Sequence, residues 1–306
     1  MLEDLNPVKV YLESLPSRQS RDVIWHSLNH FAKHALNDKS AVAENIKWAQ
    51  ITLDTIYSFR LHLDSKNTSK QTVALYLSAL RGVLKLCHEI GLLNPEHEIS
   101  ASTILNSTYI TKNPEYSTSP KHNLISSNDF IKLMKSVDRQ QKAQARDLAI
   151  ISTLYCCGLK VSEIIDLKYP DSIDPESYNF LVGDNESEES RCVPIPEEAR
   201  KYIDNWLRLR TEQKGYFFNR ISRADNVLFF EPSKENAVHP KSAKKLTVHA
   251  ISLITRELSE KAQTDIYRPK DFRASYINRL FNEGKNIETI QKLSGHQCLD
   301  SLKRFK

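Results

Sequence analysis

Apolar residues recur every three to four positions over most of residues 1–105, which is the spacing of amphipathic helices. The clearest stretches are 17–35, 52–63 and 69–90. The apolar stripe of the last stretch consists of Val73, Leu77, Leu80, Leu84 and Cys87. Thr68 with Gln71 predicts a capping box at its start, and Gly91 followed by Pro95 predicts its end. Four or five such helices would form a compact bundle.

The second half of the chain mixes helical and strand-like patterns. Helical spacing covers 126–134, 147–157, 197–210, 247–262 and 270–282, and a further helix is expected to begin near Ser162. The β-like runs 178–182 and 191–195 predict a hairpin, and 227–230 predicts one more short strand. Residues 107–124 have no apolar period and are rich in Ser, Thr, Asn and Pro, which predicts a linker. We therefore expect a helical domain at 1–106, a linker at 107–124 and a mainly helical α+β domain at 125–306.

Positive charge is concentrated towards the end of the chain. The net charge of the 306 residues is +5, but residues 1–120 hold 12 basic and 12 acidic side chains. Residues 241–306 hold 14 basic against 7 acidic. A basic block with helical periodicity fits a phosphate-rich partner, although a solvated basic face would have the same composition. Lys244 and Lys245, just before the helix at 247, fit either description.

Several function classes lack their sequence signatures. The five cysteines never form C-x-x-C, so we expect buried thiols rather than disulfides or a zinc site. No glycine-rich phosphate loop and no H-E-x-x-H motif occurs. No apolar stretch approaches the roughly 20 residues of a membrane span, and the acidic, amphipathic start is unlike a signal peptide. We therefore expect a cytoplasmic protein with no cofactor, metal, membrane partner or small-molecule substrate.

Four segments resemble, in order and spacing, the motifs of one protein family. They are RDLAIISTLYCCGLKVSEIIDL (146–167), RCVPI (191–195), YRPKDFRASYINRLFNEG (267–284) and IETIQKLSGHQCLDSLKRF (287–305). The family patterns are GLR-x-SE-L, a basic residue before VPL, PH-x-LRH-x-x-A-x-x-L-x-x-x-G, and I-x-x-LLGH-x-x-x-x-T-x-x-Y. With these segments the chain resembles the tyrosine recombinases of the phage integrase family, of the XerC/XerD-like kind. The resemblance implies a helical, SAM-like core-binding bundle and a tyrosine-recombinase catalytic-type domain, which together clamp duplex DNA.

The resemblance also implies a reaction. In this family a tyrosine attacks a DNA phosphorus, forming a 3′-phosphotyrosyl link and releasing a 5′-hydroxyl, without a nucleotide or metal. Two arginines stabilise the charge that develops on the phosphate oxygens, because their forked donors match phosphate geometry. A lysine on the hairpin acts as general acid, and histidines supply further donors.

Most of the matching positions are altered in this chain. The six family-equivalent positions hold, in chain order, Lys160, Asp184, Lys270, Arg273, His296 and Phe305. Lysine at 160 keeps a charge but loses the bidentate fork of arginine. The turn around Asp184 holds four carboxylates and no lysine. Phe305 has no oxygen with which to attack phosphorus, so the resemblance predicts a kept fold with a lost nucleophile.

Three functions remain open from the sequence. The first is a DNA-binding pseudoenzyme of a mobile element, which acts in or regulates recombination or integration, or serves as an architectural factor. Its partners would be double-stranded DNA and an active tyrosine recombinase, placing it in the cytoplasm with the nucleoid. The second is an active, divergent recombinase that uses Tyr267, Tyr276 or a partner's tyrosine, although packing in the core is the alternative reading of Tyr276. The third is a protein-interaction scaffold that no longer binds DNA.

The first function predicts a set of DNA contacts. These basic side chains are Lys70, Arg81, Lys85, Lys160, Lys244, Lys245, Lys270, Arg273 and His296. Arg273 and His296 could instead be remnants held by packing and hydrogen bonds. A laboratory change of tyrosine to phenylalanine would explain position 305 alone, and would leave the other altered positions unexplained.

Overall fold

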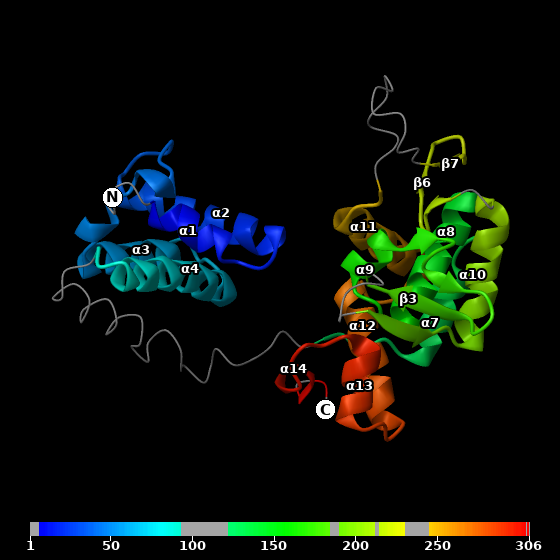
Figure 1. Cartoon of the computed structure of the whole chain (residues 1–306). Coiled ribbons are helices and arrows are strands. Elements are labelled where there is room, and N and C mark those ends of the chain that lie inside the picture. Colours follow the sequence, from blue (N-terminus) through cyan, green and yellow to red (C-terminus); the bar gives the residue numbers. More distant parts are fainter. Residues whose placement is uncertain are drawn as a thin grey trace. The chain divides into compact units, whose positions relative to one another are not determined.

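The structure, a computed structural model, describes residues 6–92, 122–183, 190–211, 214–229, 245–303 and 305. The chain divides into two compact units, Met1–Ser119 and Pro120–Lys306 (Figure 1). Most of the predicted linker, 107–124, lies outside the described residues. Within the described part of the chain, none of the helices is both long and apolar enough to cross a bilayer.

The N-terminal unit is a bundle of helices. Its described elements are α1 (Pro7–Glu13), α2 (Arg18–Ala35), η1 (Ala43–Asn45), η2 (Trp48–Gln50), α3 (Leu53–Ser65) and α4 (Lys70–Glu89). Side-chain oxygens of Ser17, Thr52 and Ser69 accept from backbone N–H groups at the starts of α2, α3 and α4, which satisfies donors that a helix start leaves open. The predicted cap at Thr68 is wrong by one residue, because the hydroxyl that reaches into the first turn is that of Ser69, 3.2 Å from the Thr72 nitrogen.

The core of this unit follows the predicted periodicity. All five residues of the α4 stripe are buried, and they pack with apolar side chains of α2 and α3. Phe31 of α2 meets Phe59 of α3 edge to face, with ring centroids 5.2 Å apart. The three predicted helices are therefore confirmed, with bounds that differ by one or two residues.

The C-terminal unit combines helices with short strands. Its described helical elements are α7 (Ser127–Lys135), α8 (Lys142–Ser152), the π-helical η4 (Thr153–Cys157), α9 (Val161–Asp166), α10 (Glu197–Arg210), α11 (Val248–Ala262), α12 (Pro269–Asn282), α13 (Ile287–Ser294) and α14 (Asp300–Lys303). The helix predicted over 147–157 begins five residues earlier and changes to π-helix at Thr153. The helices predicted at 197–210, 247–262 and 270–282 are confirmed.

The predicted hairpin forms two strands of a three-stranded antiparallel sheet. Its strands are β2 (Ile173–Asp174), β3 (Asn179–Val182) and β4 (Arg191–Pro194), in the order β2-β3-β4. Two further pairs are β1 (Lys168–Tyr169) with β5 (Gly215–Tyr216), and β6 (Arg220–Ile221) with β7 (Val227–Leu228). The register Val182↔Arg191 places Arg191 at the first residue of β4, directly opposite the last residue of β3.

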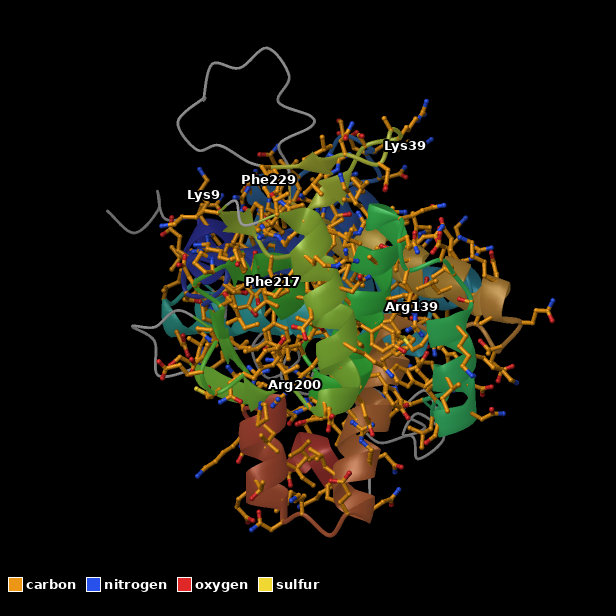
Figure 2. All side chains as sticks on the ribbon, turned by 90° about the vertical axis from the view of Figure 1, so that its right-hand side faces the viewer. Lys9, Lys39, Arg139, Arg200, Phe217 and Phe229 are labelled. Carbon is orange, nitrogen blue, oxygen red and sulfur yellow. The ribbon has the colours of Figure 1, made fainter. Side chains whose placement is uncertain are left out.

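A large apolar core joins the sheet to α8, α10 and α11. Phe217, labelled in Figure 2, is fully buried there and meets Phe180 of β3 edge to face at 5.5 Å. Arg200 of α10, labelled in the same view, lies over the ring of Tyr178 at 4.6 Å. This cation–π contact attaches the helix to the segment that leads into β3.

A second, smaller cluster lies between α12, α13 and α14. Its buried members are Ala274, Tyr276, Ile277, Leu280, Ile290, Leu302 and Phe305. It is distinct from the large core, and it contains the position that matches the family's nucleophile. The packing of this cluster therefore decides how residue 305 is held.

Two glycines shape the turns that carry the candidate site. Gly158 ends η4 with φ +63°, and a Cβ there would lie 2.1 Å from the Tyr276 ring. Gly295 ends α13 with φ +64°, and a Cβ there would lie 2.6 Å from the Arg191 guanidinium. Because both positions need a left-handed backbone and have no room for a side chain, only glycine fits.

The cysteines correct one expectation. Cys87, Cys156 and Cys157 are buried as predicted, but Cys192 and Cys298 are exposed. Cys192 lies on β4, where successive side chains point to opposite faces, so the buried Val193 leaves its neighbour on the solvent side. All five are free thiols.

Candidate phosphate-binding site

Arg273 connects three separate segments of the C-terminal unit. It projects from α12, and its Nη1 donates to the Gly158 carbonyl at 2.5 Å, while its Nη2 donates to the Ser294 carbonyl at 2.5 Å. Both carbonyls lie at helix C-termini, where intrahelical partners are missing and the dipole attracts cations. The guanidinium therefore holds the ends of η4 and α13 beside α12, and it is half-buried there.

His296 follows the Gly295 turn directly and lies beside this arginine. Its Nδ1 is 2.8 Å from the Ser294 hydroxyl oxygen and 3.3 Å from Arg273 Nη2. The imidazole is half-buried. The two family-type residues that this chain retains are thus in contact with each other.

Phe305 is packed between two imidazoles. Its ring stacks on His122 at 5.2 Å and meets His296 edge to face at 6.1 Å. It is 8% exposed and belongs to the small cluster of α12, α13 and α14. Its backbone carbonyl accepts a hydrogen bond of 3.2 Å from Asn278 Nδ2. The side chain therefore serves as an apolar element of the fold at this position.

Lys160 is engaged by a neighbouring carboxylate. Its backbone N–H donates to Glu163 Oε2 at 2.6 Å, and its Nζ lies 3.7 Å from Glu163 Oε1. The two Nη atoms of Arg191 donate to the two oxygens of the same carboxylate, each at 2.8 Å. Burial acts to raise the pKa of Glu163, but the hydrogen bonds and charge of Arg191 outweigh it, so the pKa is lowered. Glu163 is thus an anion fixed inside the candidate site.

Arg191 also reaches the turn that carries His296. Its Nε donates to the Leu293 carbonyl at 3.2 Å, and its guanidinium fills the space beside Gly295. Sequence reasoning missed Arg191 and Glu163 as site residues. The signal was present, because both lie inside the quoted motifs, in SEIIDL and RCVPI.

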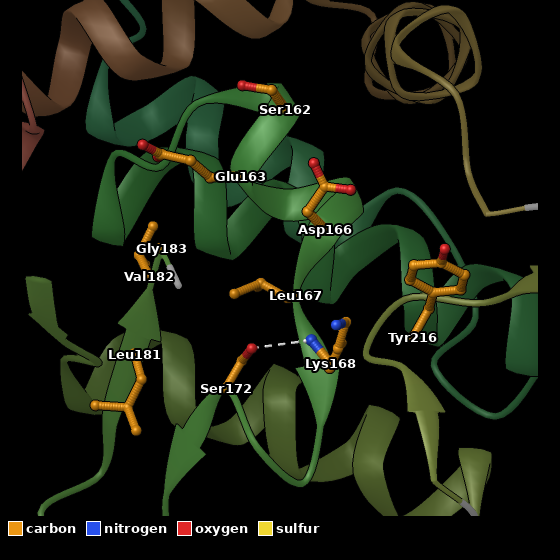
Figure 3. A pocket seen from close by; sticks show the side chains of 10 residues that line it. All are labelled: Ser162, Glu163, Asp166, Leu167, Lys168, Ser172, Leu181, Val182, Gly183 and Tyr216. Carbon is orange, nitrogen blue, oxygen red and sulfur yellow. Dashed lines mark hydrogen bonds between the residues drawn. The ribbon is translucent and has the colours of Figure 1, made fainter. Parts of the chain in front are cut away.

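A groove of about 900 Å³ lies beside these residues. Its lining includes Lys160, Glu163, Arg191, Lys292 and His296, from the start of α9, β4 and the end of α13. A smaller hollow of about 490 Å³ lies along α9 and the sheet, with Glu163 in its lining as well (Figure 3). Figure 3 also shows Asp166, Lys168 and Ser172. The backbone N–H of Lys168 donates to the Ser172 hydroxyl oxygen at 2.9 Å.

The other predicted contacts of this unit are exposed, paired with another residue or outside the described residues. Lys270 is exposed on the first turn of α12. Lys245 is half-buried and pairs with Asp166. Asp184 and Lys244 are not among the described residues.

The predicted contacts of the N-terminal unit all lie on α4. Lys70 is exposed and Arg81 is half-buried. Lys85 is exposed, and its Nζ lies 3.6 Å from Glu89. Their part in DNA binding stays a prediction.

Two tyrosines were candidates for a substitute nucleophile. Tyr276 is 5% exposed, and burial raises its pKa to about 12. Tyr267 is 2% exposed, and its hydroxyl donates to Asp129 at 2.9 Å. Burial is the largest cause that raises the pKa of Tyr267, and the hydrogen bond to Asp129 and the charge of Asp129 raise it further. The prediction that Tyr276 belongs to the core is confirmed, and both hydroxyls lie in packed surroundings.

No group of His, Cys, Asp and Glu side chains within the described ranges could hold a metal ion. The described polar side chains of the site include Arg273, His296, Glu163, Arg191 and Lys160. Such a set can bind an anion through charged N–H donors.

Comparison with known proteins identifies the family of the chain. Residues 123–305, more than half of it, match the model of the phage integrase family. The chain belongs to the phage integrase family. The matched range contains Lys160, Glu163, Arg191, Arg273, His296 and Phe305. The predicted fold class, a helical bundle with an α+β recombinase-type domain, is confirmed.

Named relatives of this integrase-family chain are tyrosine recombinases. It is 29% identical to tyrosine recombinase XerA of Pyrococcus furiosus over 167 residues, which are 55% of this chain and 52% of that protein. It is 23% identical to tyrosine recombinase XerC of Pseudomonas aeruginosa over 295 residues, which are 94% of this chain and 84% of that protein. The first match spans about half of the relative and the second spans most of it.

Solved integrase structures share the fold. The Tn1549 transposon integrase in complex with transposon right end DNA matches with a TM-score of 0.65 and 14% identity, over 98% of this chain and 94% of that chain. A lambda integrase dimer bound to a COC′ core site matches with a TM-score of 0.63 and 10% identity, over 98% of this chain and 75% of that chain. At these identities the likeness establishes the fold alone.

Proposed function

We propose that this integrase-family protein binds duplex DNA at the Arg273–His296 site without cutting it. The observation that carries the proposal is the packing of Phe305 between His122 and His296. A covalent phosphotyrosyl intermediate needs a nucleophilic oxygen, and phenylalanine has none. The protein would then be a pseudoenzyme that keeps the site's binding function.

The state of the other catalytic positions supports the same conclusion. Lys160 presents an ammonium in place of a forked guanidinium, and its Nζ lies near the Glu163 carboxylate. Stabilising the charge of a phosphoryl transition state depends on preorganised donors. Because the Lys160 ammonium is shared with the Glu163 carboxylate, it is a poor donor to the oxygens of a phosphoryl transition state.

Binding is supported by the donors that remain. Arg273 and His296 are in contact, and Lys160 and Lys292 line the adjacent groove. Charged N–H donors of this kind form short, strong hydrogen bonds to phosphate oxygens. The excess of basic residues after residue 240 is consistent with a polyanionic partner. We propose that the protein regulates recombination or integration, or shapes DNA, as the partner of an active recombinase.

A covalent-trapping experiment tests the loss of cleavage. The protein and its Phe305→Tyr variant are incubated with a pool of nicked suicide duplexes, beside an active family member on its own site. We expect no covalent protein–DNA adduct from either form, because restoring a hydroxyl leaves Lys160 and the lysine-free turn unchanged. An adduct from the unsubstituted protein would overturn the proposal. Mass spectrometry would then locate the nucleophile, and an adduct on Tyr267, Tyr276 or a partner's tyrosine would establish the active-recombinase alternative.

A binding experiment tests retention of DNA contact. Fluorescence anisotropy with selected duplexes should give a dissociation constant that rises with salt, as expected when phosphate contacts release counterions. Arg273→Ala should weaken binding about 10- to 100-fold, the range for a hydrogen bond to a charged group. Arg256→Ala removes the same charge from an exposed i,i+4 pair on α11 and serves as the control. Absence of micromolar binding near physiological salt would favour the scaffold alternative.

A further inference from the structure

Ser294 has a single hydroxyl hydrogen and two close neighbours that compete for it. The residue is fully buried at the end of α13. Its Oγ donates to the Ile290 carbonyl at 2.6 Å and lies 2.8 Å from His296 Nδ1. Since a hydroxyl carries one donor and two acceptor lone pairs, the bond to Ile290 leaves the oxygen to accept at the histidine.

We infer that Ser294 is a positioning residue that sets the tautomer of His296. A ring nitrogen 2.8 Å from an accepting oxygen must carry the hydrogen, so neutral His296 bears its proton on Nδ1. The lone pair of the neutral ring is then on Nε2. The hydrogen-bond partner of one ring nitrogen commonly decides the protonation of the other in this way.

A competing arrangement is weaker in this geometry. If Nδ1 accepted from Arg273 Nη2, the distance would be 3.3 Å, and Nδ1 and the Ser294 Oγ, which donates to Ile290, would face each other at 2.8 Å as two acceptors. The serine is also a departure from the family pattern LLGH, in which a leucine at this position offers no acceptor. The tautomer is therefore a property of this chain's own sequence, LSGH.

This tautomer has a consequence for phosphate binding, which rests on the proposed function. Phosphate oxygens of DNA only accept hydrogen bonds, so a neutral ring with its lone pair on Nε2 repels them. A protonated ring donates from both nitrogens. His296 would thus contribute to DNA binding only as the imidazolium, and affinity should rise as the pH falls through the range in which histidines titrate.

Other charged groups surround the ring and define the controls. Within the described part of the chain they include Arg273 on α12, Lys160 and Glu163 at α9, Arg191 on β4, Lys292 on α13, and His122 across the Phe305 ring. Of these, His122 is the other imidazole. A His122→Gln variant therefore separates its titration from that of His296.

Nitrogen NMR tests the tautomer directly. In protein labelled with ¹⁵N-histidine at about pH 8, long-range ¹H–¹⁵N correlations of His296 should identify Nδ1 as the protonated nitrogen. Ser294→Ala and Ser294→Cys, which remove or weaken the acceptor, should shift the ring towards the Nε2–H form, and Ser294→Thr should restore the Nδ1–H form. An Nε2–H ring in the unsubstituted protein overturns the inference. An unchanged tautomer of His296 in both Ser294→Ala and Ser294→Cys overturns it as well.

DNA affinity measured against pH tests the consequence. Between pH 8 and 5.5, affinity should rise by up to about tenfold per pH unit, the limit for one linked proton. The same rise is expected for His122→Gln, and a flatter profile is expected for Ser294→Cys and His296→Asn. A steep rise that persists in Ser294→Cys contradicts the link to the tautomer. Failure to bind at every pH contradicts the proposed function instead, and leaves the NMR result as the test of the tautomer.

Discussion

The phenyl ring of Phe305 stacks on the imidazole of His122, with centroids 5.2 Å apart and ring planes inclined by 22°. His122 precedes α7, and its Nδ1 lies 3.7 Å from a carboxylate oxygen of Asp271, which is fully buried on the first turn of α12. The nucleophile position of the family is thus used here to join the segment after α14 to the opening of the C-terminal unit.

The packing of this ring predicts its contribution to stability. Phe305→Ala should lower the free energy of unfolding by about 3 kcal/mol, because burial is lost and a cavity is left. Urea denaturation followed by fluorescence measures the change. Ile131→Ala, at an exposed position of the same unit, is the control and should change stability by less than about 0.5 kcal/mol. Equal midpoints for the two variants would show that residue 305 is not packed in solution.

The pair formed by Glu163 and Arg191 predicts a dependence of stability on pH. The folded-state pKa of Glu163 is lowered from 4.5, so the unfolded chain binds the proton first as the pH falls. The stabilisation is complete above pH 4.5 and is lost as the pH falls through the folded-state pKa. Glu163→Gln should therefore destabilise the protein by about 3 kcal/mol at pH 7, and by less as the pH approaches 3. A difference that stays constant over this range would exclude the ion pair as its cause.

Three histidines of the N-terminal unit predict sensitivity to mild acid. The rings of His34 and His62 are 4.9 Å apart, and those of His30 and His62 are 6.5 Å apart. Burial lowers the pKa values of His30 and His34, and the charge of His62 lowers them further. Because the unfolded chain then binds more protons, stability should be full above pH 6.5 and should fall as the pH drops below it.

Hydrogen exchange of the α2 amides at pH 7.5 and 5 measures this effect. His62→Gln should reduce the loss of protection at pH 5, since it removes the like charge. His88→Gln, on α4 near its end, controls for the loss of one imidazole. Equal protection of the unsubstituted protein at the two pH values would contradict the prediction.

The cysteines predict a simple chemical result. Burial raises the pKa values of Cys87 and Cys156 to about 12, and that of Cys157 well above its usual range. Because the thiolate is the reactive form, a thiol reagent should modify two cysteines per native chain, the exposed Cys192 and Cys298. All five should react in denaturant. Peptide mapping that finds modified Cys157 in the native protein would contradict the core packing.

The periodicity of the sequence predicted most helices, because an amphipathic stripe identifies the buried face of a helix without knowledge of its partner. Sequence patterns failed where neighbouring residues were equally suited to the same structural role. Thr68 and Ser69 are both capable caps, and only the backbone path selects the second. The expectation that Cys192 is buried was wrong. The sequence does not reveal which face of β4 is covered, so it could not show on which face this side chain lies.

The sequence by itself determined that residue 305 lacks a nucleophilic oxygen and that Arg273 and His296 remain, since these are facts of composition at matched positions. Only the tertiary structure decided that Phe305 packs between two histidines. It also decided that Arg191 binds Glu163 and the Leu293 carbonyl. These contacts join residues 28 and 102 positions apart in the chain. Side chains so distant in sequence meet only after the helices and the sheet have packed, so local patterns carry no record of their pairing.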